Sequence, residues 1–85
     1  MIYQIFYTET ALRELKKLDK NTQRRIVFVL ERIRYNPFKY VRKLVGREEY
    51  RLRVGDYRVL MRIDQGKLII LVVALGHRKN VYKKN

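Results

Sequence analysis

The chain has 85 residues, 47% of them hydrophobic, and its 21 basic and 8 acidic residues give a net charge of +13. This length suits a single domain over residues 1–85 with a small core, and the hydrophobic content excludes wholesale disorder. The absence of cysteine excludes disulfides and thiolate chemistry, and a single histidine argues against a zinc site.

The strong positive charge predicts a polyanionic partner. Nucleic acid is the first expectation, and an acidic protein is compatible with it. An anionic membrane is less favoured, because the basic residues are spread over the predicted elements and form no amphipathic terminal helix. No apolar run approaches the roughly 18 residues of a membrane helix, and no signal peptide pattern is present, so we expect a cytoplasmic protein.

The first elements are a strand and a helix. Residues 2–7 are rich in β-branched and aromatic side chains, which indicates a strand. Thr8 is the expected N-cap of the helix, with Glu9 in its first turn. The apolar stripe of this helix consists of Ala11, Leu12, Leu15 and Leu18. Its outer face is expected to carry Arg13, Glu14, Lys16 and Lys17.

A second helix is predicted over residues 20–35, capped by Asp19 or Asn21 and ended by Pro37. Its inner side consists of Ile26, Val29, Leu30 and Ile33. Val27 and Phe28 widen the apolar surface, and we interpret them as completing the contact between the two helices; the alternative is a groove for a partner. The short link predicts an antiparallel helical hairpin.

Residues 38–49 are expected to form a connection in which Leu44 reaches the core. Residues 50–63 then alternate apolar and basic side chains on both sides of Gly55-Asp56, a pattern that predicts a β-hairpin with a type II′ turn. The register follows from the two-residue turn. The predicted opposite pairs are Val54 with Tyr57, Arg53 with Arg58, Leu52 with Val59 and Arg51 with Leu60.

One face of this hairpin is apolar and the other carries the arginines Arg51, Arg53, Arg58 and Arg62. Like charges that lie directly opposite each other, about 5 Å apart at Cβ, destabilise a hairpin. The arrangement is reasonable if an anion lies across it, because guanidinium groups bind phosphate through two parallel hydrogen bonds. The alternative is a basic face that contacts only solvent.

Residues 64–67 predict a second turn, and residues 68–75 a strand covered on both faces. The segment after Gly76 turns polar. The order is strand, two helices and three strands, which predicts an α+β fold. In it the N-terminal strand and a three-stranded antiparallel meander form one sheet with the helical hairpin on one face and the arginines on the other. The position of the first strand in the sheet is left open.

The candidate functional residues are Arg51, Arg53, Arg58, His77, Arg78 and Tyr82. The sequence has no glycine-rich phosphate loop, no Ser/His/Asp spacing and no acidic pair on one face, so we expect neither a cofactor nor a catalytic metal. A cluster of cations with one imidazole and one phenol suits metal-independent RNA cleavage, in which the 2′-hydroxyl attacks the adjacent phosphate.

Three motifs resemble the RelE/ParE toxin superfamily, and within it the RelE branch. They are Leu44-x-Gly46, the run over residues 50–59, and Gly76-His77-Arg78 followed by Val81-Tyr82. The resemblance implies a toxin of a type II toxin–antitoxin pair that enters the ribosomal A site and cleaves mRNA there. It also implies a small, partly disordered antitoxin, with which the toxin assembles as a heterotetramer; the positive charge of this chain leads us to expect that antitoxin to be acidic.

By position, the resemblance places Arg51 and Arg53 where RelE toxins have catalytic lysines. Arg58 matches an arginine that holds the scissile phosphate, and Arg78 one that stabilises the transition state or protonates the leaving group. Tyr82 matches a tyrosine that stacks on a base or transfers a proton. Arginine stays protonated and cannot act as a base. The base is therefore expected to be Tyr82 or His77, since imidazole titrates near neutrality.

Two other functions stay open at the level of the sequence. A ParE-like toxin would poison DNA gyrase without being an enzyme; the arginines and Tyr82 argue against it. A non-catalytic RNA- or ribosome-binding module would use the same cations on the backbone alone, with steep salt dependence and no cleaved product.

Overall fold

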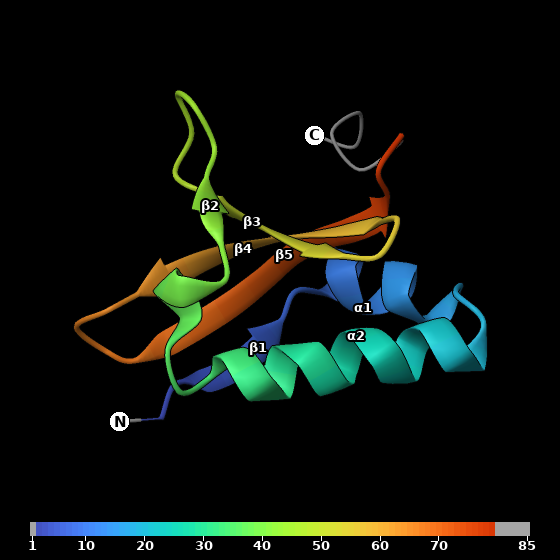
Figure 1. The fold of residues 1–85 in the computed structure, drawn as a ribbon, viewed down its shortest axis with the longest axis horizontal. Helices are drawn as coiled ribbons and strands as arrows, with labels where there is room; N and C mark the ends of the chain where they lie inside the picture. The colour runs from blue at the N-terminus through green and yellow to red at the C-terminus, as the bar shows by residue number, and fades with distance from the viewer. Residues whose placement is uncertain (1, 80–85) are drawn as a thin grey trace.

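The computed structural model describes residues 2–79. The elements in chain order are β1 (Gln4–Tyr7), α1 (Glu9–Lys16), α2 (Lys20–Ile33), the 3₁₀ turn η1 (Pro37–Lys39), β2 (Arg42–Lys43), β3 (Tyr50–Val54), β4 (Tyr57–Asp64) and β5 (Ile69–His77). The strands form a sheet in the order β1-β5-β4-β3-β2, in which β1 is parallel to β5 and the other neighbours are antiparallel. The two helices lie against one face of this sheet (Figure 1).

Both helices begin where the sequence predicts. The Thr8 hydroxyl accepts a hydrogen bond from the backbone N–H of Ala11 at 3.1 Å, and the Asp19 carboxylate accepts one from Thr22 at 3.3 Å. These caps satisfy backbone donors that the first helical turn leaves without partners. The helices run antiparallel, side by side (Figure 1), so the predicted helical hairpin is confirmed.

The main core lies between the helices and the sheet. Its fully buried side chains include Ala11, Ile26, Leu30, Val59, Met61, Ile70, Val72 and Leu75. Fully burying one Leu or Ile contributes about 1.5–3 kcal/mol, so this layer is the main stabilising feature of the fold. The face of β2, β3 and β4 that points away from the helices carries the basic residues beside a small apolar cluster around Leu60.

The hairpin of β3 and β4 has the predicted register, with Arg53 opposite Arg58 and Val54 opposite Tyr57. Gly55 has a φ of 58°, as the first central residue of a type II′ turn requires. A Cβ at Gly55 would lie only 3.2 Å from Nη1 of Arg25, a residue of α2. The turn therefore favours glycine for its backbone conformation, and a larger residue would also require the Arg25 guanidinium to shift slightly.

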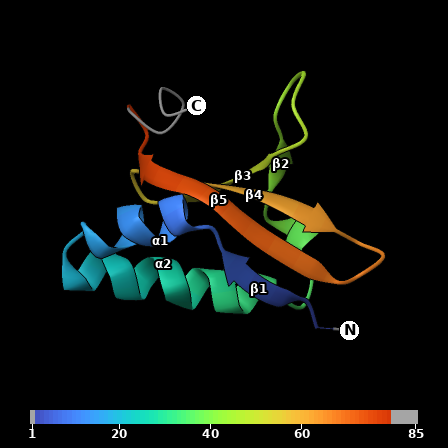
Figure 2. The ribbon, with the colours of Figure 1, turned by 180° about the vertical axis from the view of Figure 1, so that it is seen from behind.

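One prediction for α1 is wrong: Glu14 is buried with 8% of its surface exposed, whereas Leu12 is 40% exposed. The physical reason is the edge of β5. β1 ends at Tyr7, so beyond Val72 the edge of β5 that faces away from β4 has no strand beside it (Figure 2). There the Glu14 carboxylate accepts a hydrogen bond from the N–H of Leu75 at 2.9 Å and takes the place of the missing strand.

Val27 and Phe28 do not complete the contact between the helices, so that interpretation is also wrong. These residues are 37% and 63% exposed, whereas Ile26, Leu30 and Ile33 are buried and Val29 packs against the core beside them. The alternative that the sequence left open, an apolar surface for a partner, fits this exposure.

The stretch predicted as a plain connection contains β2, whose Arg42 pairs with Arg51 of β3. This adds a fifth strand to the expected sheet. Leu44 packs outside the main core, in a small cluster with Leu60, Val73 and Ala74 on the sheet face away from the helices. The sequence predicted that β5 is covered on both faces. Val73 is only half-buried, which shows that the face away from the helices is covered in part. Neither helix of the described residues is long and apolar enough to span a membrane.

Candidate nucleic-acid interface

The cationic site lies on the sheet face opposite the helices, at the β2 edge. Arg42 and Arg51 are directly opposite each other in the sheet, and Arg53 is two residues along the same strand. With Tyr40 they line a hollow of about 480 Å³. Within residues 2–79, none of these three guanidinium groups makes a hydrogen bond or an ion pair. The hollow therefore presents three cations that no carboxylate neutralises.

Arg58 extends this basic surface toward β5, and the backbone of Arg78 is held next to the same hairpin. Arg58 is the cross-strand neighbour of Arg53 and faces Gly76, which has no side chain to cover it. The backbone N–H of Arg78 donates to the carbonyl of Asp56 at 2.8 Å, which fastens the end of β5 to the turn of the hairpin. Neither Arg58 nor Arg78 lines the hollow that Arg51 and Arg53 share.

His77 lies on the other face of the sheet. It pairs with Tyr57, and the two rings pack edge to face with 5.7 Å between their centroids. Its Nδ1 accepts a hydrogen bond from the backbone N–H of Lys79 at 3.3 Å. Because Tyr57 packs against the main core, this places the imidazole on the helix side, away from Arg53 and Arg58. Tyr82 lies outside the described residues.

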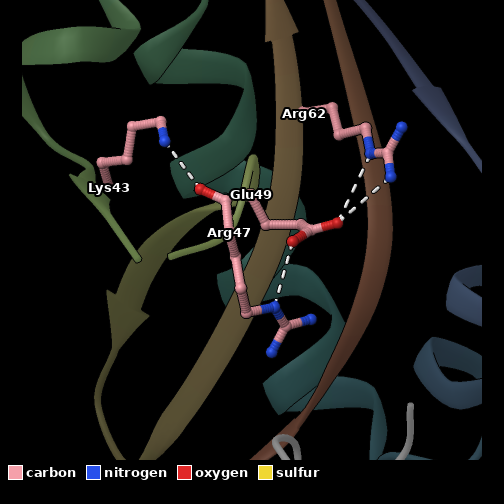
Figure 3. Close-up of polar contacts among 4 residues, drawn as sticks. All are labelled: Lys43, Arg47, Glu49 and Arg62. Carbon is pink, nitrogen blue, oxygen red and sulfur yellow. Dashed lines mark hydrogen bonds and ion pairs between the residues drawn. The ribbon is translucent and has the colours of Figure 1, made fainter. Parts of the chain in front are cut away.

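A second group of cations on the same face is neutralised by Glu49. One carboxylate oxygen of Glu49 lies 3.1 Å from Nε of Arg47, and the other lies 3.4 Å from Nη2 of Arg62 (Figure 3). Lys43 donates from Nζ to the carbonyl of Arg47 at 2.6 Å. These contacts hold the loop between β2 and β3 against β4.

The Glu49 side chain is only 13% exposed. Burial raises the pKa of the Glu49 carboxyl. The hydrogen bond from its own backbone N–H and the guanidinium groups of Arg47 and Arg62 lower this pKa, and together they outweigh burial, so the pKa lies below its usual value. Glu49 is therefore ionised at neutral pH and compensates part of the charge of Arg47 and Arg62.

Sequence reasoning missed three residues of this region: Tyr40, Arg42 and Glu49. For Glu49 a signal existed, because extending the hairpin register by one pair places it opposite Arg62. Tyr40 and Arg42 carried no such signal, because β2 has only two residues and no alternation can be read from it.

The chemistry open to this surface is anion binding and charge stabilisation. Arg51, Arg53 and Arg58 can hold a phosphate through paired hydrogen bonds and stabilise charge that develops on it, but they cannot accept a proton. Within the described part of the chain, no three His, Asp or Glu side chains come together to hold a metal ion.

The fold and this surface define a small basic α+β protein with an uncompensated cationic sheet face. The sequence matches the family "ParE toxin of type II toxin-antitoxin system, parDE" over residues 5–82. The chain therefore belongs to the RelE/ParE superfamily of type II toxin–antitoxin toxins, as its motifs led us to expect.

Individual relatives carry RelE names. The chain is 35% identical over 82 residues to a RelE-like toxin protein of Escherichia coli, covering 93% of this chain and 86% of the relative. It is 31% identical over 88 residues to toxin RelG of Mycobacterium tuberculosis, covering 99% and 100%. It is also similar to a chain in the crystal structure of the toxin–antitoxin complex RelBE2 of Mycobacterium tuberculosis, with a TM-score of 0.84 and 27% identity over 92% of this chain and 100% of that one.

Proposed function

We propose that this toxin is a ribosome-dependent endoribonuclease that cleaves mRNA in the A site. The observation that supports it most directly is the row of guanidinium groups from Arg51 and Arg53 to Arg58, none of which has a counterion in the described residues. The resemblance to RelE toxins assigns phosphate binding and charge stabilisation to these same positions. Such crowding of like charge costs stability in the free protein, and a bound phosphate offsets it.

The proposed reaction is an in-line displacement. The 2′-oxygen of the substrate forms a bond to the adjacent phosphorus, and the bond from phosphorus to the 5′-oxygen breaks, which leaves a 2′,3′-cyclic phosphate and a 5′-hydroxyl. Arg58 holds the phosphate, while Arg51 and Arg53 stabilise the additional negative charge of the transition state. Arg78 stabilises or protonates the departing oxygen.

The proton of the 2′-hydroxyl needs an acceptor other than these arginines. His77 is on the opposite face of the sheet, so of the two expected candidates Tyr82 is the one we retain. Only the phenolate form of a tyrosine can accept this proton, and that form is scarce near neutrality. We therefore propose that the ribosome aligns the 2′-hydroxyl for attack, so that free RNA is cleaved poorly.

The test uses ribosomes programmed with a defined mRNA and primer extension to map the cut. The wild-type chain should cut in the A site, and the Arg58→Ala/Arg78→Ala variant should not, with an unchanged melting temperature. Full cleavage by the double variant would contradict the assigned roles.

The competing function is gyrase poisoning, because the matching family is named for ParE toxins. It is tested with the same protein in a DNA supercoiling assay. Gyrase inhibition without any effect on translation would replace the endonuclease proposal. Ribosome binding with intact mRNA would instead indicate a non-catalytic binding module.

The proposed partner in the cytoplasm is a cognate acidic antitoxin, assembled with the toxin as a heterotetramer. The net charge of +13 favours an acidic chain. The exposed Val27 and Phe28 line an apolar hollow of about 470 Å³ on α2, which suits apolar side chains of such a partner. A bound antitoxin should raise the melting temperature, because it binds only the folded toxin.

A further inference from the structure

We propose that Tyr40 and Arg42 form a nucleotide subsite beside the scissile link, in which the Tyr40 ring stacks on an RNA base and Arg42, together with Arg51, holds a backbone phosphate. This inference rests on the proposed function and names two substrate-contacting residues outside the motifs that carry the resemblance.

Tyr40 is 46% exposed, yet the turn that carries it is held in place. Its backbone N–H donates to the carbonyl of Pro37 at 3.0 Å, and Pro37 is itself buried. Phe38, which follows Pro37 in the same turn, packs edge to face on Tyr50 of β3, with 5.4 Å between the ring centroids. The exposed ring therefore sits on a turn that is anchored to the strand that carries Arg51 and Arg53.

The surroundings of the ring combine an aromatic face with cations. Nζ of Lys39 lies over the ring, 5.8 Å from its centroid, and Arg42, Arg51 and Arg53 line the same hollow as Tyr40. Proteins bind single-stranded RNA by stacking bases on exposed aromatic rings beside a positively charged groove. Both parts of this arrangement are present here within one hollow of about 480 Å³.

Arg42 is difficult to explain by stability alone. β2 has two residues, and Arg42 places its charge directly opposite Arg51. A like-charged pair at opposite positions weakens strand pairing, most of all in a strand this short. A phosphate between the two guanidinium groups would reverse that effect by accepting hydrogen bonds from both.

The chain offers matched controls. Tyr35 is a more exposed tyrosine, at 67%, and it lines a hollow in which none of the lining residues is charged. Arg32 lies on α2 over the Phe28 ring, outside the proposed subsite. Tyr35→Leu and Arg32→Gln therefore remove the same groups from places where we expect no RNA.

The experiment measures fluorescence anisotropy of a labelled hexanucleotide of 2′-O-methyl RNA, which cannot be cut by 2′-hydroxyl attack. Tyr40→Leu should weaken binding about tenfold, the loss expected from one base–ring stack, and Tyr40→Phe should bind within about twofold of the wild type. Arg42→Gln should weaken binding and lower the slope of log Kd against log salt by about 0.7, the value for one phosphate contact on a single strand.

The subsite is overturned if Tyr40→Leu and Arg42→Gln bind like Tyr35→Leu and Arg32→Gln, or if the wild-type chain does not bind the oligonucleotide. The cleavage assay on programmed ribosomes is read separately. If the wild type cleaves mRNA and the Tyr40 variants bind the oligonucleotide as tightly as the wild type, the subsite is rejected and the endonuclease is kept. Loss of oligonucleotide affinity in the variants without any cleavage by the wild type would reject the endonuclease and keep the subsite.

Discussion

Two groups of arginines share one face of the sheet and differ in a single respect. Arg47 and Arg62 contact the carboxylate of Glu49 (Figure 3), whereas Arg42, Arg51 and Arg53 contact no carboxylate within the described residues. Each group lines a hollow of about 480 Å³. We refer to the first group as the paired cluster and to the second as the unpaired cluster.

The difference shows that the arginines of this chain serve two separate purposes. In the paired cluster the ions hold the loop between β2 and β3 in place, and a bound anion would have to compete with Glu49. In the unpaired cluster the like charges strain the sheet and leave every guanidinium donor available. The position of one carboxylate therefore separates arginines that stabilise the fold from arginines that can bind a phosphate.

The largest effect is expected from removing charge in the unpaired cluster. Arg51→Gln with Arg53→Gln should lower A-site cleavage at least about 100-fold, since each removed donor stabilises developing charge. The free energy of unfolding should change by less than about 0.5 kcal/mol, because neither side chain has a partner to lose. Arg24→Gln with Arg32→Gln removes the same charge from α2 and should leave cleavage intact; equal losses in both variants would mean that net charge alone matters.

A carboxylate placed in the unpaired cluster should convert it into a paired one. Arg42→Glu puts an acid opposite Arg51, so it should stabilise the protein by about 0.5 kcal/mol while weakening RNA binding about tenfold. Chemical denaturation and oligonucleotide anisotropy measure the two quantities. Arg42→Gln is the neutral control and should fall between the wild type and Arg42→Glu in both; a stability gain without loss of affinity would argue against phosphate at this position.

The converse change is to remove the carboxylate of the paired cluster. Glu49→Gln should destabilise the protein by about 1 kcal/mol, because the partly buried contacts to Arg47 and Arg62 lose their charge. Those arginines then become available to RNA, so the salt dependence of oligonucleotide binding should become steeper. Unchanged stability with unchanged salt dependence would show that the two clusters do not differ in function.

The smallest effect is a pH dependence of the paired cluster. The pKa of Glu49 is lower in the folded state than its usual value near 4.3, so its contribution is fully present above about pH 4.3 and is lost as the pH falls through the folded pKa. The difference in unfolding free energy between the wild type and Glu49→Gln should thus be constant from pH 7 to about pH 5 and shrink in more acidic buffer. A difference that persists at pH 2 would have to come from packing.

Much of the fold was predictable because it depends on neighbours in the sequence. Thr8 and Asp19 cap the helices as expected, and the turn at Gly55 fixes which residues of β3 and β4 oppose each other. A two-residue turn leaves one register, so the facing pair Arg53 and Arg58 followed from the turn itself.

The errors concern residues whose environment is built by distant parts of the chain. Glu14 has the spacing of a surface residue, yet it is buried because β5 needs an acceptor where β1 ends. β2 is too short for a periodic pattern and exists only because β3 offers it an edge. Phe28 is a large apolar residue of the kind that packs in a core, but α2 buries the side that carries Ile26, Leu30 and Ile33, and Phe28 is left exposed.

By itself the sequence determined the caps, the turn at Gly55, the alternation of the strands and the excess of positive charge, because each of these depends on contacts within a few residues. Only the tertiary structure decided which arginines are neutralised, that His77 lies apart from the arginines, and that Tyr40 joins Arg42, Arg51 and Arg53. Ion pairing and the lining of a hollow depend on distances between separate strands, which the sequence does not show. A strand of two residues such as β2 is also too short for an alternating pattern that would reveal which residues lie beside it.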